Sequence, residues 1–427
     1  MLTAVLRAFR TPDLRRKLLI TFAIIAVFRL GSVIQGPGVS TQNVHDCVSA
    51  TANSGVYQII NLFSGGALLQ LSVFALGIMP YITSSIIIQL LVEVIPRLKS
   101  LKQEGHAGEQ KLIQYTRYLT IALAVLQSTG IVALARSGRL IACSQPLIPD
   151  QSVFALTTLI ITLTAGTGVI MWLGELITNK GIGNGMSLLI FTSIASRIPS
   201  EGSSILQKSG GFVFAIILVL GIAIVMAVIF IQQADRRIPV QYAKRVVGRR
   251  VLGGSSTYIP LKINQAGVIP IIFASSLLQV PALLDQVWNN KSFDRFYQQY
   301  LYRGDHPIYI AIYFLLILFF TYFYVAITFN PVEQADNMKK HGGFIPGIRP
   351  GRPTAEFLDY VLSRITFPGA LFLGTLSILP IIALGVSGGN QFPFGGTTVL
   401  ILVGVGLEFV KQVESQLMLR NYEGFLR

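Results

Sequence analysis

The stretch NLFSGGALLQL, residues 61–71, is followed directly by SVFALGIMPYITSSIIIQLL, residues 72–91. The second segment is long enough to cross a bilayer, because a transmembrane helix needs about 20 mostly apolar residues. The first is apolar too, but it is about half that length and contains a serine and two glycines. A half-length apolar segment before a full one predicts a re-entrant helix in a membrane protein.

The composition is that of an integral membrane protein. Of the 427 residues, 52% are hydrophobic and 12% are charged, and the mean hydropathy is +0.62. A soluble globular chain carries about 25% charged residues. Basic residues precede the first apolar run and no small-residue cleavage site follows it, so we expect this run to be retained as a span.

Ten segments are candidates for membrane spans. They cover residues 18–34, 71–95, 118–135, 153–177, 186–198, 210–234, 266–288, 307–329, 365–386 and 397–413. The fifth and tenth are short or interrupted by polar residues, as expected of spans that line a wet interior.

The distribution of Lys and Arg predicts the orientation of the chain. With the amino terminus in the cytoplasm, 26 of the 34 basic residues lie on the cytoplasmic side, 7 lie on the outer side and Arg29 lies inside the first span. This asymmetry places both termini in the cytoplasm. Most of the net charge of +15 is therefore on one face. Attraction to anionic lipid explains a thin basic fringe but not two long basic loops.

Charged residues inside the spans are scarce, which argues against two functional classes. Arg29, Glu175 and Glu408 lie near span ends, where snorkelling accounts for them, and all four histidines are in loops. An ion-coupled secondary transporter usually has a buried carboxylate or histidine relay. An intramembrane hydrolase needs a base beside its nucleophile. We therefore expect no enzymatic activity. A secondary transporter with broken helices is the alternative function.

Prolines and cysteines leave several structural choices open. Pro80, Pro270, Pro281, Pro368 and Pro380 fall in spans, where proline favours a kink or a break that lines a cavity. The two cysteines, Cys47 and Cys143, fall in outer loops, where either a disulfide or two separate thiols fit. Nothing in the sequence indicates a metal site or a cofactor.

Two cytoplasmic segments, about residues 235–264 and 330–362, are the more specific signal. The first alternates in IPVQYAKRVVGRRV, continues through a Gly-Gly pair and alternates again in STYIPLKI, which predicts a hairpin that turns at the two glycines. The second is stiffened by prolines. Such basic projections suit docking of an acidic or nucleic-acid-containing partner. Charge that only sets topology is the alternative, but topology needs no hairpin. The basic residues are Arg236, Arg237, Lys244, Arg245, Arg249, Arg250, Lys339, Lys340, Arg349 and Arg352.

Several runs resemble one family along essentially the whole chain and in order. They are FSGGAL (63–68), LGIMPYITSSIIIQLL (76–91), QYTRYLTI (114–121), GIGNGMSLLIF (181–191), RRIPVQYAKRVVGRR (236–250), PLKINQAGVIPIIFASSL (260–277), NPVEQADNMKKHGGFIPGIRPG (330–351) and YEGFL (422–426). The chain resembles the bacterial SecY family, the channel subunits of preprotein translocases.

This resemblance implies an all-α polytopic protein of the bacterial cytoplasmic membrane. Ten transmembrane helices would form two inverted halves, residues 1–205 with spans 1 to 5 and residues 206–427 with spans 6 to 10, around a central hourglass pore. The implied function is a protein-conducting channel. It would translocate unfolded, signal-bearing preproteins and release membrane helices laterally into lipid.

The resemblance also implies a closing device made of two parts. One is a constriction of bulky aliphatic side chains, which by motif fall on Ile82, Ile86, Met186, Ile190, Ile272 and Ile401. Met186 stands where many members carry a branched residue, and methionine is longer and more flexible. The other part is a plug, about residues 61–71, that includes Asn61, Leu62, Phe63, Ser64, Gly65, Gly66, Ala67, Leu68 and Leu69. A narrow apolar constriction dewets, so it blocks ions without binding a passing peptide.

Spans 2, 3, 7 and 8 resemble the lateral gate of the family. Gln127, Asn264 and Gln265 are candidates for gate hydrogen bonds worth about 1 kcal/mol each, with structural bonding as the equal alternative. The implied partners are SecE-type and SecG-type small subunits, the SecA motor ATPase, the translating ribosome, signal peptides, nascent chains and lipid. Arg349 in GIRPG matches a position for motor coupling, and Arg249 and Arg250 match contacts to the motor or to ribosomal RNA. No GxxxxGK[ST] motif is present, so the energy must come from a partner.

Overall fold

The computed structural model describes residues 11–44, 64–68, 70–136, 147–242, 245–247, 250–252, 256–287, 295–301, 306–386 and 396–424. Each predicted span coincides with a helix. These are α2 (Pro12–Val33), α5 (Met79–Val94), α7 (His106–Arg136), α8 (Val153–Lys180), α9 (Gly185–Ala195), α10 (Ile198–Gln233), α11 (Ile269–Val287), α13 (Pro307–Thr328), α15 (Arg352–Val386) and α16 (Gly396–Gly424). Five described helices are long and apolar enough to span alone, and α5 with α6 (Pro96–Gln103), bent by 100°, would make a sixth.

Side-chain caps and one glycine explain several helix boundaries. Asn184 Oδ1 accepts hydrogen bonds from the amides of Met186 and Ser187 at the start of α9, at 3.0 and 3.4 Å, which satisfies donors that the helix itself cannot pair. Gly210 has a φ of +79° and interrupts α10. The helical segment after it matches the sixth predicted span, which begins at the same residue.

The second span begins later than predicted. Helix α5 starts at Met79, and residues 71–78 form turns instead of the expected helix. Pro80 lies in the first turn of α5 and Pro270 in the first turn of α11, where no helical hydrogen bond is lost. These two prolines therefore initiate helices, whereas Pro281 lies inside α11.

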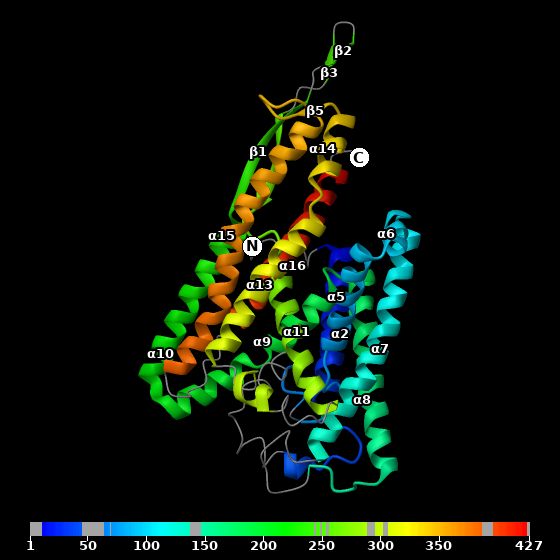
Figure 1. The fold of residues 1–427 in the computed structure, drawn as a ribbon, viewed down its shortest axis with the longest axis vertical. Coiled ribbons are helices and arrows are strands. Elements are labelled where there is room, and N and C mark those ends of the chain that lie inside the picture. Colours follow the sequence, from blue (N-terminus) through cyan, green and yellow to red (C-terminus); the bar gives the residue numbers. More distant parts are fainter. Residues whose placement is uncertain are drawn as a thin grey trace.

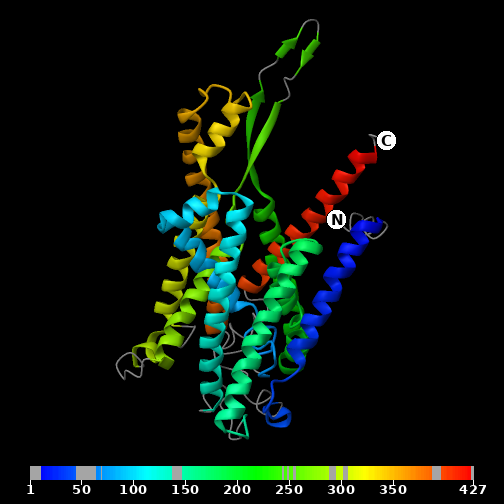
Figure 2. The same ribbon diagram turned by 90° about the vertical axis from the view of Figure 1, so that its right-hand side faces the viewer.

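The helices form two groups that meet along a central seam. Helices α2, α5, α7 and α8 lie on one side, α10, α13 and α15 lie on the other, and α9, α11 and α16 lie between them (Figure 1). Across the seam, α9 contacts α16, and α11 contacts both α5 and α7. Helix α2 begins and α16 ends toward the end of the molecule that carries the hairpin (Figure 2), which agrees with both termini on the cytoplasmic side.

The predicted cytoplasmic hairpin is present. Strand β1 (Asp235–Tyr242) pairs antiparallel with β4 (Ser256–Lys262), and β2 (Arg245–Val247) pairs with β3 (Arg250–Leu252) in the same register. The chain therefore reverses between Val247 and Arg250. Gly253 and Gly254 lie outside the described residues, but the pairing of β2 with β3 contradicts a reversal at these glycines, since it puts them on the returning side of the hairpin.

The second basic segment joins the same structural unit. It contains α14 (Pro331–Lys340) and β5 (Gly343–Phe344), and β5 pairs with β1. Ile238, Val240 and Leu261 of the hairpin share one apolar core with Met338 of α14 and Leu358 of α15. We call β1–β5, α14 and residues 352–362 of α15 the cytoplasmic platform. Sequence reasoning treated the two segments as separate projections, whereas the structure makes them one.

The platform core can be tested at Leu358, whose side chain is fully buried. Replacing Leu358 with alanine leaves a cavity and should destabilise the platform by about 2–5 kcal/mol. In membrane vesicles, we expect protease to cleave the β1–β4 hairpin faster than in the parent. Val332→Ala on the exposed face of α14 is the matched control. Equal cleavage of the parent and Leu358→Ala would contradict a shared core.

Candidate functional site

The predicted ring residues converge at the seam between the two groups of helices. Ile190 of α9, Ile272 of α11 and Ile401 of α16 belong to one buried apolar cluster, and Ile82 of α5 packs against it. Ile86, one turn further along α5, belongs to the neighbouring cluster, which Ile82 also contacts. Residues that are far apart in the sequence thus meet in one aliphatic region contributed by four helices.

Met186 also packs against this cluster, from the first turn of α9. Its sulfur lies in the space left by the missing side chain of Gly174, so that any β-carbon at Gly174 would overlap it. The flexible thioether therefore fills a notch in α8. The Met186 side chain therefore packs against Gly174 of α8 as well as against the cluster that contains the other predicted ring residues.

An apolar region of this kind has a limited chemistry. It offers neither hydrogen-bonding groups nor charges, so it can exclude water and ions when packed. It also makes only non-directional contacts, which hold no particular peptide sequence in place.

The plug stretch is described at Ser64–Leu68, Gln70 and Leu71, while Asn61, Leu62, Phe63 and Leu69 lie outside the described residues. Ser64 is helical, and residues 65–68 form turns in which Gly65 and Gly66 have φ values of +67° and +93°. Ser64, Ala67 and Leu68 are each 1% exposed. The stretch is thus buried in the protein, as its apolar composition requires.

The charged residues near span ends have partners within the protein. Arg117 of α7 and Glu175 of α8 form a two-pronged ion pair with distances of 2.8 and 2.6 Å, which is the strongest geometry for this pair. Arg29 of α2 donates from Nη1 to the carbonyl oxygen of Gly65 at 3.2 Å. Snorkelling alone had been expected for Arg29 and Glu175, because sequence does not show which helices are neighbours.

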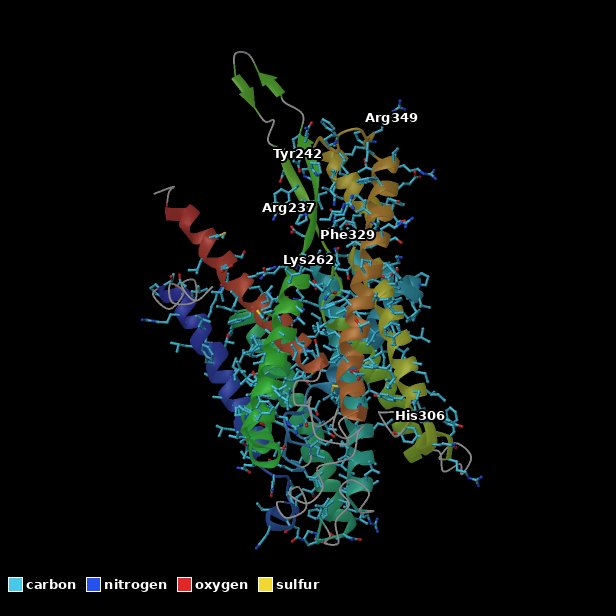
Figure 3. The ribbon with its side chains drawn as sticks, turned by 90° about the vertical axis from the view of Figure 1, so that its left-hand side faces the viewer. Arg237, Tyr242, Lys262, His306, Phe329 and Arg349 are labelled. Carbon is cyan, nitrogen blue, oxygen red and sulfur yellow. The ribbon has the colours of Figure 1, made fainter. Side chains whose placement is uncertain are left out.

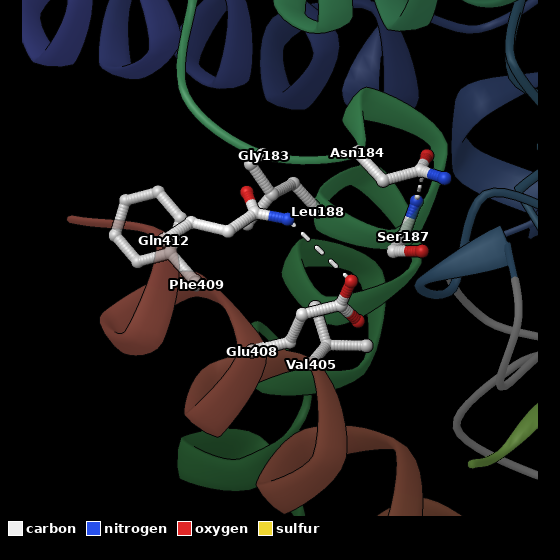
Figure 4. Close-up of a pocket in the computed structure, with 8 residues that line it drawn as sticks. All are labelled: Gly183, Asn184, Ser187, Leu188, Val405, Glu408, Phe409 and Gln412. Atoms are coloured by element: carbon white, nitrogen blue, oxygen red, sulfur yellow. Dashed lines mark hydrogen bonds between the residues drawn. The ribbon is translucent and has the colours of Figure 1, made fainter. Parts of the chain in front are cut away.

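Glu408 lines a small hollow between α9 and α16. Its Oε1 accepts a hydrogen bond from Gln412 Nε2 at 3.5 Å (Figure 4). Asn184 and Ser187 contribute further polar groups, and Leu188, Val405 and Phe409 close the apolar side. On α16 the hollow lies toward the carboxyl end from Ile401. Polar side chains therefore line the seam on the cytoplasmic side of the aliphatic region.

Two of the three amide candidates for the gate have buried side chains, and Gln265 is half-buried. Gln127 of α7 is 8% exposed, and Asn264, in the loop before α11, is 6% exposed. Asn264 Nδ2 donates to the carbonyl of Gly267 at 3.2 Å, within its own loop. The side-chain oxygens of Asn264 and Gln265 are buried and have no hydrogen-bond partner among the described residues.

The basic residues of the platform lie at one end of the molecule. Arg349 and Tyr242 lie near this end, Arg237 and Lys262 lie further along toward the membrane helices, and His306, before α13, lies beyond them in the other half of the molecule (Figure 3). Arg237 is held by Asp235 at 3.2 Å and lies over the ring of Tyr258, with its guanidinium carbon 4.9 Å from the ring centroid. Arg236, Lys339, Lys340 and Arg352 are also exposed.

Arg349 is exposed on a fixed loop. The carbonyl oxygen of Arg349 accepts a hydrogen bond from the buried hydroxyl of Thr354 at 2.9 Å, so the backbone is held while the guanidinium faces solvent. Lys244 and Arg249 lie outside the described residues, as do Cys47 and Cys143, and the side chains of Arg245 and Arg250 are not described.

Sequence reasoning missed two contributors to this region. The Gly36 amide donates to the Leu71 carbonyl at 2.9 Å, and the Val73 amide donates to the Ile34 carbonyl at 2.9 Å, around a Gln35–Ser72 bridge. This bridge joins the end of α2 to the residues after the plug stretch. The other contributor is Phe74, which stacks on Phe28 with ring centroids 5.9 Å apart. Pro80 is the sequence signal for this segment, because proline favours the first turn of a helix and so indicates that residues 71–78 precede the helix.

Known proteins match this arrangement in both sequence and fold. The chain is 61% identical to the protein translocase subunit SecY of Streptomyces galbus and 57% identical to that of Mycobacterium tuberculosis, with all of each chain covered. The structure is similar to one solved as a protein-conducting channel, with a TM-score of 0.64, 18% identity and coverage of 94% of this chain and 92% of that one. It is also similar to Sec61 in a canine ribosome-channel complex, with a TM-score of 0.61, 16% identity and coverage of 94% and 92%.

At such low identity, the likeness to the two solved structures establishes the fold alone. The family model for SecY, however, matches residues 72–410, which include every predicted ring and gate residue and the whole platform. Together with the full-length relatives, this match shows that the chain belongs to the SecY family.

Proposed function

We propose that the chain is the protein-conducting channel of a bacterial translocase, with its constriction at Ile82, Ile86, Met186, Ile190, Ile272 and Ile401. The convergence of these residues from four helices in a continuous apolar region carries the proposal. Unfolded preproteins pass through this constriction. Membrane segments leave sideways, between the helices that meet at the seam.

The gate in this proposal is the contact of α11 with α5 and α7, together with α13. The contacts that α11 makes with α5 and α7 are the ones that must part for a lateral opening, since they join the two groups of helices. Residues 1–205 and 206–427 then act as the two halves that separate. Asn264 and Gln265, in the loop before α11, have buried oxygens without a partner among the described residues, and such acceptors destabilise the closed packing of this loop.

The plug in this proposal is the stretch at about residues 61–71. Its described part is buried beside α2 and α9, and the bridge at Gln35 and Ser72 joins the two ends of the loop that carries it. Displacement of this stretch opens the outer side of the channel while the bridge keeps it attached.

The cytoplasmic platform is the docking surface for the partners that drive transport. Its exposed arginines and lysines suit an acidic motor of the SecA type or the phosphates of ribosomal RNA. SecE-type and SecG-type subunits complete the membrane complex, in contact with lipid, signal peptides and nascent chains. In this proposal the chain has no catalytic step of its own, so the motor or the ribosome supplies the energy.

An ion-coupled secondary transporter is not supported. Such a protein needs titratable groups that change partners near the middle of the membrane. Glu175 is engaged with Arg117, and Glu408 lies in the polar hollow on the cytoplasmic side. A solute-flux assay in vesicles would detect this activity if it were present.

The constriction can be tested by substitution of its aliphatic residues. Replacing Ile82, Ile86, Ile190 or Ile401 with serine should admit water, raise the ion conductance of the resting translocase in planar bilayers and relax rejection of defective signal sequences. Ile24→Ser is the matched control, because Ile24 is buried in the same cluster but belongs to α2. Unchanged conductance in all four ring variants would refute the constriction.

The docking surface can be tested by charge reversal at Arg349. Arg349→Glu should reduce motor-driven export of a signal-bearing precursor into vesicles severalfold, with little effect on assembly of the membrane complex. Arg97→Glu makes the same charge change at an exposed position of α6, outside the platform. Equal loss of export and assembly in Arg349→Glu would indicate misfolding and count against the proposed role.

A further inference from the structure

Among the described residues, Arg29 is a charged side chain of the first span that contacts the plug stretch. Arg29 lies one turn before the end of α2, and its Nη1 donates to the carbonyl oxygen of Gly65 at 3.2 Å. A guanidinium stays protonated in proteins, so it cannot lower its cost by losing its charge. An arginine at this depth is expensive unless it is paired or hydrated. The carbonyl of Gly65 therefore gives the half-buried guanidinium of Arg29 a partner inside the protein.

The backbone of Gly65 is placed for this contact by close packing. Its φ of +67° is in the left-handed region, and a β-carbon there would lie 3.1 Å from the Cα and the carbonyl oxygen of Ser193 in α9. A side chain at residue 65 would thus push the stretch away from α9. Glycine lets the stretch fit between Arg29 on one helix and Ser193 on another.

The other backbone bonds described for this turn are short-range, and one of them, from the Ser72 amide to the Ala67 carbonyl at 3.1 Å, ties the turn to the bridge residue Ser72. The Ala67 amide donates to the Ser64 carbonyl at 3.3 Å, and the Leu68 amide donates to Ser64 Oγ at 3.2 Å. These bonds hold the turn together and move with it. The bond from Arg29 instead joins the turn to a different helix, so it must break when the turn leaves its place.

The bridge between Gln35 and Ser72 defines where movement can begin. It clamps the residues just after α2 to the residues just after the plug stretch. Arg29 lies on the α2 side of this clamp, and Gly65 lies on the loop beyond it. The stretch can therefore swing away as a tethered unit while Arg29 stays on its helix.

We propose that Arg29 is the positioning residue that retains the plug in the closed channel, through its hydrogen bond to the Gly65 carbonyl. In the closed state Arg29 is half-buried, and the bond gives its guanidinium a partner on the plug stretch. When a peptide displaces the plug, water hydrates the guanidinium in place of Gly65. Retention is thus strongest while the plug is seated and weaker once opening has begun. This inference rests on the proposed plug role of the stretch.

The first test is the resting conductance of the assembled translocase in planar bilayers. Arg29→Met removes the donor and should raise conductance about tenfold, the effect expected from losing a hydrogen bond to a charged group. Arg29→Lys keeps a charge on a side chain with fewer donors and should give a smaller rise. Arg16→Met removes a charge from an exposed position on the same helix and should have no effect. Parental conductance in Arg29→Met would overturn the proposal.

A second readout follows the plug itself. With Cys47 and Cys143 replaced by serine, a cysteine at buried Ser64 reports exposure of the stretch to a membrane-impermeant maleimide added from the outer side. We expect labelling about tenfold faster when Arg29→Met is added, and equal rates would refute retention by Arg29. If the Ile86→Ser channel leaks but Arg29→Met has the parental conductance and labelling rate, only the proposed role of Arg29 is refuted. No leak in any ring variant would refute the channel constriction.

Discussion

Aliphatic packing at the seam holds the two groups of helices together at the centre of the molecule. Ile190, Ile272 and Ile401 come from three helices and bury their side chains in one cluster. In a membrane, lipid tails are as apolar as these side chains, so the cluster gains little from the hydrophobic effect and depends on close packing. A seam of this kind is tight when the side chains interdigitate, and it has few directional bonds to break when a peptide separates them.

The polar groups described above lie outside the aliphatic cluster at the seam. The Arg117–Glu175 ion pair fastens α7 to α8 within one group of helices, where no separation is required. The polar hollow at Glu408 lies on the cytoplasmic side of the aliphatic region. The non-helical residues 71–78 are inside the protein, where the bridge to residues 34–36 satisfies backbone groups that lipid would leave unpaired. In this segment the irregular backbone is thus kept inside the protein.

Much of the fold could be predicted from sequence, because length and hydropathy locate helices and lysine and arginine fix orientation. The helices at the predicted segments, the cytoplasmic hairpin and the start of the sixth span at Gly210 follow from these patterns, while the count of ten spans stays a prediction. The late start of α5 was not predicted, since residues 71–78 are as apolar as a span; residues 71–73 pair with residues 34–36, and local turns hold the residues after them. The sequence also did not predict that the two basic segments form one structural unit. The strand that joins them, Gly343–Phe344, has only two residues, which is too short to show an alternating pattern. The predicted ring positions follow from the resemblance to the family. Contacts between distant residues, such as Met186 against Gly174, are visible only in the structure.

The shared core of the cytoplasmic platform has a mechanical consequence. Val325, in the last turn of α13, packs in the same core as Ile238 of the hairpin and Leu358 of α15. A side load applied at the hairpin tip therefore acts as a torque about this core, with the long β1–β4 ladder as the lever arm. The load reaches α13 and α15 through Val325 and Leu358, which share the apolar core with the base of the ladder. A bulky partner that leans on the tip would thus deliver its work to the helices beside the seam without entering the membrane.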